Sequence, residues 1–239
     1  MLYIEKGPEP TELTEYRACK WNSEEQQPVF PSYDNMPTAV KSAVRASLLR
    51  EQGYLCAYCM RRITEENVRI EHWQAERELD DSGKLNYGNM LGVCPGKVLA
   101  SPDADNANAL SGHLSETCDR HRGHTPLHVN PRSRLNMERI AYHFGNGRIY
   151  STDEQIDIDI NNTLNLNCGR PHFLPQNRKK VLEEIVKRLN RRNFDKQWRI
   201  CELNKLKNHY EARNARGELP EYAGVALWYI NSRLKRAGA

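Results

Sequence analysis

Four cysteines of this sequence are spaced as ligands for a single metal ion. Cys56 and Cys59 form a Cys-x-x-Cys knuckle, and two thiolates at this spacing can hold one zinc ion from a tight turn. Cys94 and Cys118 are the best candidates for the other two ligands of a tetrahedral site. The alternative is a redox pair, but that motif requires a βαβ context that residues 61–64 do not offer. We therefore predict a structural zinc site closed by thiolates, with no open position for a reactive water.

An acid and a histidine lie side by side between these cysteines. Val68 and Ile70 alternate with polar residues, which predicts a short strand that ends at Glu71 and His72. A carboxylate can bind a hard divalent cation, and a neutral imidazole can accept a proton from water. Hydrolysis of a phosphodiester needs both functions. A lone histidine is more often structural, so the prediction depends on the position of this pair between zinc ligands.

The order of the motifs resembles the HNH endonuclease superfamily: Cys-x-x-Cys, then Glu-His, then Asn-Met-Leu with a cysteine soon after, then Cys-Asp-x-x-Arg-Gly. The resemblance implies a ββα-metal finger in which His72 is the general base and Glu71 a metal ligand. Asn89 matches the middle Asn, which orients the base loop or the metal, and Asp119 matches the final motif position. Many members have His or Asn directly after the fourth cysteine, so His121 is a rival ligand. These side chains other than His72 would hold a catalytic Mg²⁺ or Mn²⁺.

Basic residues supply candidate contacts to nucleic acid. Arg122 stands where a lysine is common in the HNH superfamily, and its guanidinium could hold a phosphate bidentately. Outside the finger, Arg178, Lys179 and Lys180 could follow a phosphate backbone. A solvated helix face is an equally open interpretation of these three residues.

Beyond the finger, the chain resembles the PtuB-like HNH nucleases of Septu-type anti-phage systems, which also occur beside retron reverse transcriptases. The resemblance is carried by residues 51–62, the strand 69–72 and the segment 163–167. It implies a PtuA-like ATPase as partner and, in the retron version, a reverse transcriptase carrying msDNA. DNA is the favoured substrate, and structured RNA such as tRNA stays open. The alternative function is a non-catalytic zinc ribbon that binds nucleic acid or a protein partner.

The sequence predicts that these residues are positioned by an α+β fold, with a zinc-stapled ββα finger, flanking helices and a helical C-terminal lobe. Residues 1–35 are predicted to form an N-terminal arm with few regular elements. Residues 36–150 are predicted to form the nuclease domain, with the ββα-metal core at about 54–130. Residues 151–239 are predicted to form the helical lobe, which could dock a partner or nucleic acid.

Periodicity places the helices along the chain. Pro37 opens a pattern of apolar residues at helical spacing, and Gly53 stands where a left-handed cap would end this helix. Residues 178–189 have one apolar stripe among basic residues, which predicts a basic amphipathic helix. Two more helical patterns cover residues 198–210 and 222–230, whereas the segment between Cys94 and Cys118 indicates a long surface loop.

Composition limits the classes of protein that the chain can represent. The chain has 239 residues, a formal net charge of +4 and a mean hydropathy of −0.80, which permits nucleic-acid binding without requiring it. We expect no membrane association and a cytoplasmic location, because no segment has the apolar length of a signal or a membrane span. Seven cysteines without an export signal are expected to be reduced thiols or metal ligands.

Overall fold

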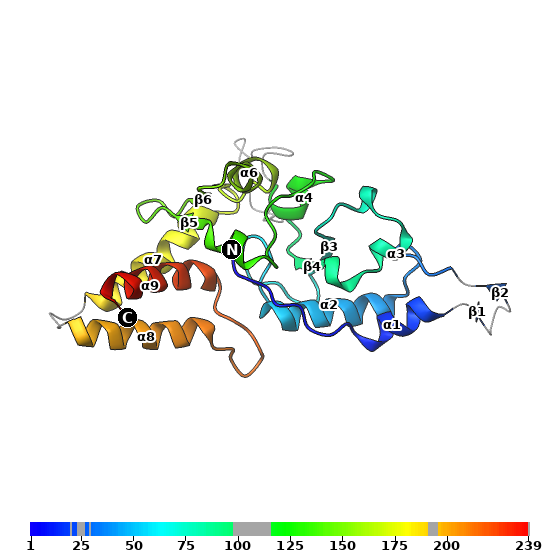
Figure 1. Cartoon of the computed structure of the whole chain (residues 1–239), viewed down its shortest axis with the longest axis horizontal. Helices are drawn as coiled ribbons and strands as arrows, with labels where there is room; N and C mark the ends of the chain where they lie inside the picture. Colours follow the sequence, from blue (N-terminus) through cyan, green and yellow to red (C-terminus); the bar gives the residue numbers. More distant parts are fainter. Residues whose placement is uncertain (20, 23–26, 29, 98–115, 191–195, 239) are drawn as a thin grey trace, which may run out of the picture.

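The computed structural model describes residues 1–19, 21–22, 27–28, 30–97, 116–190 and 196–238. Within these residues, helices alternate with three small antiparallel sheets, each of two strands, which confirms the α+β class (Figure 1). The first part contains α1 (Thr11–Ala18), β1 (Trp21–Asn22), β2 (Gln27–Pro28) and α2 (Thr38–Gln52). The finger region contains β3 (Arg69–His72), η1 (Glu76–Glu78), α3 (Asp81–Lys84), η2 (Tyr87–Asn89), β4 (Met90–Val93) and α4 (Cys118–Arg122).

The rest of the chain, as far as the structure describes it, begins with a short helix and a small hairpin and ends in three long helices. Its elements are α5 (Arg134–Glu138), β5 (Ile140–Tyr142), β6 (Ile149–Ser151), α6 (Glu154–Ile158), the π-helix η4 (Asp159–Thr163), α7 (Leu174–Leu189), α8 (Lys196–Glu211) and α9 (Ala223–Ala237). The three long helices lie at one end of the elongated molecule, and α1 and α3 lie toward the other end (Figure 1).

The N-terminal arm is more regular than predicted. Residues 11–18 form α1, which packs on α2 and buries Leu13 completely. The sequence did not predict this helix, because Leu13 and Tyr16 are too few to form an apolar stripe. The arm therefore belongs to the body of the protein through a second, smaller core beside the finger.

Helix α2 forms as its sequence predicts. Pro37 precedes its first turn, and Val40, Val44 and Leu48 are buried. Gly53 caps the helix after Gln52, and its φ of +60° is the predicted left-handed conformation. A Cβ at this position would also lie 2.5 Å from Cγ of Leu219, so glycine is required on two grounds.

The finger is a hairpin followed by a short helix. Strands β3 and β4 pair antiparallel, with Glu71 opposite Leu91 and His72 opposite Met90. The outer edge of β4 is closed by the buried side chain of Gln52, which accepts a hydrogen bond from the Gly92 N–H at 2.7 Å and donates one to the Gly92 carbonyl at 2.7 Å. The finger's helix, α4, begins at Cys118. The predicted loop before it lies largely outside the described residues, which omit 98–115.

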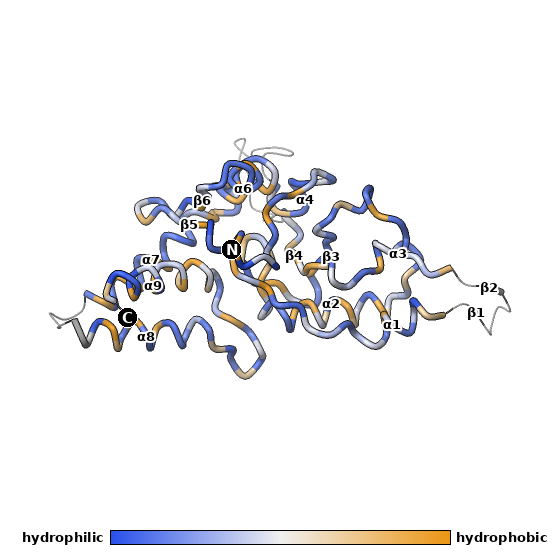
Figure 2. Tube along the Cα trace, in the orientation of Figure 1, coloured by the Kyte–Doolittle hydropathy of each residue, from blue (hydrophilic) through white to orange (hydrophobic). Residues whose placement is uncertain are grey.

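A continuous core joins the finger to the helical lobe. One cluster of buried apolar residues contains the four cysteines, Leu91 and Val93 of the finger, and Leu182, Ile185 and Ile230 of α7 and α9. The predicted division after residue 150 falls within strand β6, and this cluster has members on both sides of it. Apolar residues occur in short stretches between hydrophilic ones (Figure 2). Among the described residues, no helix has both the length and the apolar character needed to cross a membrane.

Candidate metal centre and nuclease site

The four predicted zinc ligands come together. The Sγ atoms of Cys56, Cys59, Cys94 and Cys118 all lie within 4.8 Å of one another, and all four residues are buried. Three of the S–S distances are 3.9 Å (Cys56 to Cys118), 3.8 Å (Cys59 to Cys94) and 3.8 Å (Cys94 to Cys118). A tetrahedron with Zn–S bonds of about 2.3 Å has edges of about 3.8 Å. The cluster therefore has the size and donor chemistry of a zinc site.

Two turns with unusual backbone present these thiols. In the knuckle, Met60 has a φ of +63° and its N–H donates to the Cys56 carbonyl. The knuckle is tied to the hairpin because Ala57 N–H donates to the Gly92 carbonyl at 3.0 Å. Cys118 has a φ of +57°, and its N–H donates to the Leu164 carbonyl at 2.8 Å. The cysteine cluster thus joins the knuckle, β4 and α4.

The sulfur atoms differ in their affinity for protons. Burial raises the pKa of Cys56 and of Cys118 well above the usual thiol range. The pKa of Cys94 is lowered by its hydrogen bonds with the thiols of Cys118 and Cys56. Arg61 also donates to Sγ of Cys94, at 3.4 Å. A zinc ion would replace the shared protons and hold all four sulfurs as thiolates.

Glu71 is buried at the end of β3, with only 7% of its surface exposed. Its Oε1 accepts a hydrogen bond from the Tyr58 hydroxyl at 3.1 Å and one from the Arg122 guanidinium. Burial raises the pKa of Glu71 well above its usual range, the nearby Asp119 carboxyl raises it further, and Arg122 opposes both effects. Two adjacent carboxyls of this kind suit Mg²⁺, which proteins often bind through one or two carboxylates while it retains water.

His72 is covered on all sides in this conformation and is 2% exposed. Nδ1 lies 2.9 Å from Oε1 of Glu76, and Nε2 lies 2.7 Å from the Lys84 carbonyl oxygen. The ring of Tyr33 meets it edge to face, with centroids 4.7 Å apart. Both nitrogens face acceptors, and a neutral imidazole can donate to only one of them. A water can reach Nδ1 only after the Glu76 side chain moves away.

Asn89 holds the backbone that follows His72. Its Oδ1 accepts from the Gln74 N–H at 2.9 Å, and its Nδ2 donates to the Gln74 carbonyl at 3.2 Å. Its own carbonyl accepts from the Trp73 N–H at 2.9 Å. Of the two predicted roles for Asn89, this geometry fits the orientation of the base loop, and metal binding by Asn89 stays a prediction.

Asp119 and His121 both lie on α4, but their side chains have different neighbours. The Asp119 carboxyl lies close enough to Glu71 to raise its pKa, whereas Nδ1 of His121 lies 3.0 Å from the Thr163 carbonyl in η4. Residues two apart on a helix do not share a face, so one helix cannot turn both toward Glu71. Among the described residues, the four cysteines form the one compact group of three or more His, Cys, Asp or Glu side chains. The carboxylate pair Glu71 and Asp119 is therefore the part of the predicted catalytic metal site that the geometry brings together.

Arg122 does not have the exposure that a phosphate contact requires. It is 3% exposed and donates to Glu71, to the His72 carbonyl at 2.9 Å, to the Trp73 carbonyl at 2.7 Å and to the Thr125 carbonyl at 2.7 Å. This corrects the predicted phosphate contact, because these internal acceptors engage each of its guanidinium nitrogens. Arg122 instead ties α4 to the end of β3.

Of the three α7 residues predicted to contact nucleic acid, one is buried and two lie at the surface. Arg178 is 1% exposed, and its guanidinium donates to the Gly147 carbonyl at 2.7 Å and the Leu166 carbonyl at 2.9 Å. The prediction that Arg178 follows a phosphate backbone is therefore wrong. Lys179 lies partly exposed beside Glu183, at 3.5 Å, and Lys180 is exposed. Their contact with nucleic acid stays a prediction.

Three residues of this site were not predicted from the sequence. Glu76 and Tyr33 cover His72, and Tyr58 supports Glu71. Glu76 follows His72 at a spacing of four residues, which is a local signal that the sequence does contain. Tyr33 has no such signal, because the arm reaches the finger only through tertiary packing.

No family model, curated protein or solved structure matches the chain. Fold and site by themselves define an α+β protein with a buried four-cysteine cluster that can hold a metal ion.

Proposed function

We propose that this protein is a metal-dependent HNH-type endonuclease that hydrolyses phosphodiester bonds in nucleic acid. The proposal is supported by the finger, which contains both the cysteine cluster and the predicted catalytic residues. Its cysteine cluster joins the knuckle, β4 and α4, and the paired strands and α4 carry Glu71, His72 and Asp119. The order of these motifs resembles the HNH superfamily, in which the same three positions perform the chemistry.

In the proposed mechanism each side chain has a separate task. His72 takes a proton from water at Nδ1 once Glu76 has moved away, and the water oxygen attacks phosphorus as the bond to the leaving oxygen breaks. Glu71 and Asp119 would hold the divalent ion, and Asn89 fixes the backbone after the base. A bound Mg²⁺ or Mn²⁺ would stabilise negative charge on the phosphate oxygens. The zinc site takes no part in the reaction, because four thiolates complete its coordination.

Replacement of the base tests this proposal directly. His72→Ala should lower the rate of Mg²⁺-dependent cleavage by roughly 10²–10⁴-fold, the usual contribution of a positioned acid or base. Cleavage of double-stranded DNA, single-stranded DNA and tRNA should be measured with the purified chain alone and with its co-purified partners. The matched control is His124→Ala, because His124 is exposed and lies in the same region of the chain.

Zinc content and the far-ultraviolet circular dichroism spectrum of His72→Ala must match those of the parent protein, because His72 is buried. A folded, zinc-loaded His72→Ala protein that cuts at the parental rate would remove His72 as the base. It would favour the second candidate function, a non-catalytic zinc module. That second candidate is favoured by one observation: both ring nitrogens of the buried His72 already lie at hydrogen-bond distance from acceptors.

We further propose that the nuclease acts in anti-phage defence as a PtuB-like subunit, with DNA as the favoured substrate. The support is the resemblance of residues 51–62, 69–72 and 163–167 to that family. Co-purification from cells should recover an ATPase of the PtuA type, with or without a reverse transcriptase carrying msDNA. Sequencing of the nucleic acids cut after activation would identify the substrate, and recovery of the chain alone would contradict the proposed assembly.

A further inference from the structure

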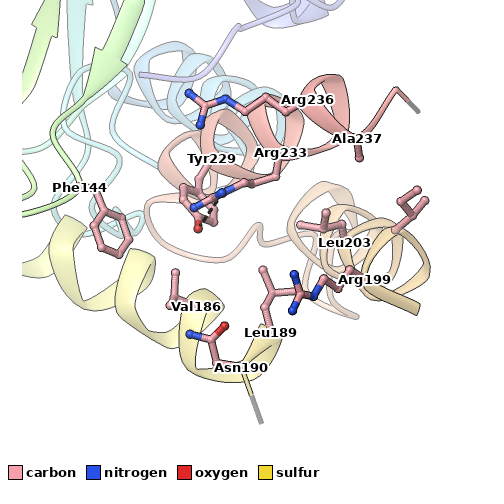
Figure 3. A pocket seen from close by; sticks show the side chains of 11 residues that line it. Phe144, Val186, Leu189, Asn190, Arg199, Leu203, Tyr229, Arg233, Arg236 and Ala237 are labelled. Atoms are coloured by element: carbon pink, nitrogen blue, oxygen red, sulfur yellow. Dashed lines mark hydrogen bonds between the residues drawn. The ribbon is translucent and has the colours of Figure 1, made fainter. Parts of the chain in front are cut away.

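A cavity of about 510 Å³ lies between the long helices, at the end of the molecule away from α1 and α3. Its walls come from α7, α8, α9 and the turn between β5 and β6 (Figure 3). This volume is typical of sites for small organic ligands, which are commonly about 300–1,000 Å³. The cavity contains none of the residues assigned to the finger, so an inference drawn from it is independent of the proposed nuclease activity.

Part of the cavity lining is apolar. Val186 and Leu189 of α7 are half-buried, as is Ile200 of α8, while Leu203 is 5% exposed. Phe144 is 45% exposed, although its ring stacks on Tyr229 with centroids 5.9 Å apart. Such side chains leave apolar surface facing the cavity, and contact with an apolar ligand would remove that surface from water.

The charged side chains of the cavity all have the same sign. Arg199, Arg233 and Arg236 line it, and no Asp or Glu is among its described lining residues. None of these three guanidiniums forms an ion pair within the part of the chain that the structure describes. Arg233 is held in place by Tyr229, because its Nε donates to the hydroxyl at 3.0 Å. Figure 3 shows Phe144 and Arg199 at opposite sides of the cavity, with Arg233 beside Tyr229.

We propose that this cavity binds an amphipathic organic anion, a small molecule with an apolar body and a carboxylate, phosphate or sulfonate group. The aliphatic and aromatic side chains would cover the body, and the arginines would bind the anionic group through charge-assisted hydrogen bonds. The wall of Val186, Leu189, Ile200 and Leu203 does not suit a polynucleotide, whose bases stack on aromatic rings and whose backbone is polar throughout.

The test uses 1-anilinonaphthalene-8-sulfonate, whose fluorescence rises in an apolar site, and the uncharged N-phenyl-1-naphthylamine as its analogue. The sulfonate should bind the full-length folded chain saturably, one molecule per chain, and more tightly than the uncharged analogue. Arg233→Glu with Arg236→Glu should weaken its binding at least tenfold. The matched control is Lys187→Glu with Lys235→Glu, which makes the same charge change on α7 and α9 outside the lining.

A second variant tests the location. Ala237→Trp places a large side chain at the cavity wall near the end of α9 and should also lower the affinity, with an unchanged melting temperature. Competition by decanoate and by adenosine 5′-monophosphate distinguishes an aliphatic from a heteroaromatic body. Equal binding of the uncharged analogue, equal losses in the arginine and lysine variants, or full binding by Ala237→Trp would each overturn the proposal.

Discussion

Arg61 lies beside the cysteine cluster and contacts one of its sulfur atoms. Its guanidinium donates to Sγ of Cys94 at 3.4 Å, and a zinc ion with four thiolates carries a formal double negative charge. A buried charge of this size requires a compensating cation or hydrogen bonds. Arg61 therefore acts as a partner of the site without binding the ion.

Removal of this guanidinium should weaken zinc binding. Arg61→Met is expected to lower the affinity for zinc by about 10–100-fold, the usual effect of losing an outer partner of a metal ligand. Competition with a chromogenic chelator measures the affinity directly. Arg69→Met, which removes an exposed arginine at the start of β3, is the control, and an equal effect in both variants would show a general loss of charge.

Tyr33 reports on the cover over His72. Burial, together with the carboxylates of Glu76, Asp119 and Glu71, raises the pKa of Tyr33 from 10.0 to about 12. Tyr33 therefore holds its proton more tightly in the folded state than in the unfolded state. Its contribution to stability is complete below pH 10 and is lost as the pH rises to 12.

Tyr33→Phe should therefore lose less free energy of unfolding than the parent protein between pH 10 and pH 12. Denaturant unfolding at a series of pH values measures the difference between the two proteins. The other buried tyrosines contribute equally to both, so their contributions cancel. Parallel pH curves for the two proteins would mean that Tyr33 lies in solvent and that the arm does not cover the finger.

How far single residues could be predicted depends on how local their roles are. The cysteines were predicted because a zinc knuckle is a short-range pattern, and their convergence is confirmed. Arg178 was misjudged although a signal was present. It lies four residues before Leu182 and seven before Ile185, on the buried stripe of α7. Its acceptors at Gly147 and Leu166 come from distant segments, so only the tertiary structure shows how its charge is accommodated.

At the scale of elements, the finger depends on the end of α2. Gln52 is 4% exposed and bridges the Leu55 carbonyl, the Gly92 carbonyl and the Gly92 N–H. These bonds satisfy the edge of β4 that does not face β3. The sequence predicted the helix and its glycine cap, but the side chain that closes the sheet could not be derived from periodicity.

Gln52→Met keeps the length of the side chain and removes its polar atoms. We expect the free energy of unfolding to fall by about 2 kcal/mol, because the Gly92 N–H would be left buried without its acceptor. Urea unfolding measures this loss. Gln155→Met, on the exposed side of α6, should change stability by less than about 0.5 kcal/mol.

At the scale of the whole molecule, the cysteine cluster belongs to the same core as the long helices. Cys56, Cys118, Leu182 and Ile230 are members of one buried cluster, so loss of the metal should weaken the body of the protein and not only the finger. Residues 36–150 and 151–239 were predicted as separate lobes. Apolar periodicity shows which side of a helix is buried but does not show which distant element buries it.

Cys118→Ser should lower bound zinc below one ion per chain and reduce the free energy of unfolding by several kcal/mol, because metal binding contributes to folding. Elemental analysis and thermal melts under reducing conditions measure both effects. Cys201→Ser is the control, since Cys201 is exposed and outside the cluster. Unchanged zinc content in Cys118→Ser would reject the site, and separate melting of finger and helices would contradict the shared core.

The closed position of His72 also has a consequence for chemical labelling. Diethyl pyrocarbonate acylates imidazole nitrogens that solvent reaches, so the exposed His124, His128 and His143 should react well before His72, which is 2% exposed. The rate at which His72 acquires the label then measures how often Glu76 and Tyr33 move away from it. Any molecule whose binding moves Glu76 or Tyr33 away from His72 would shorten this time, so labelling can detect such binding whatever the function of the site.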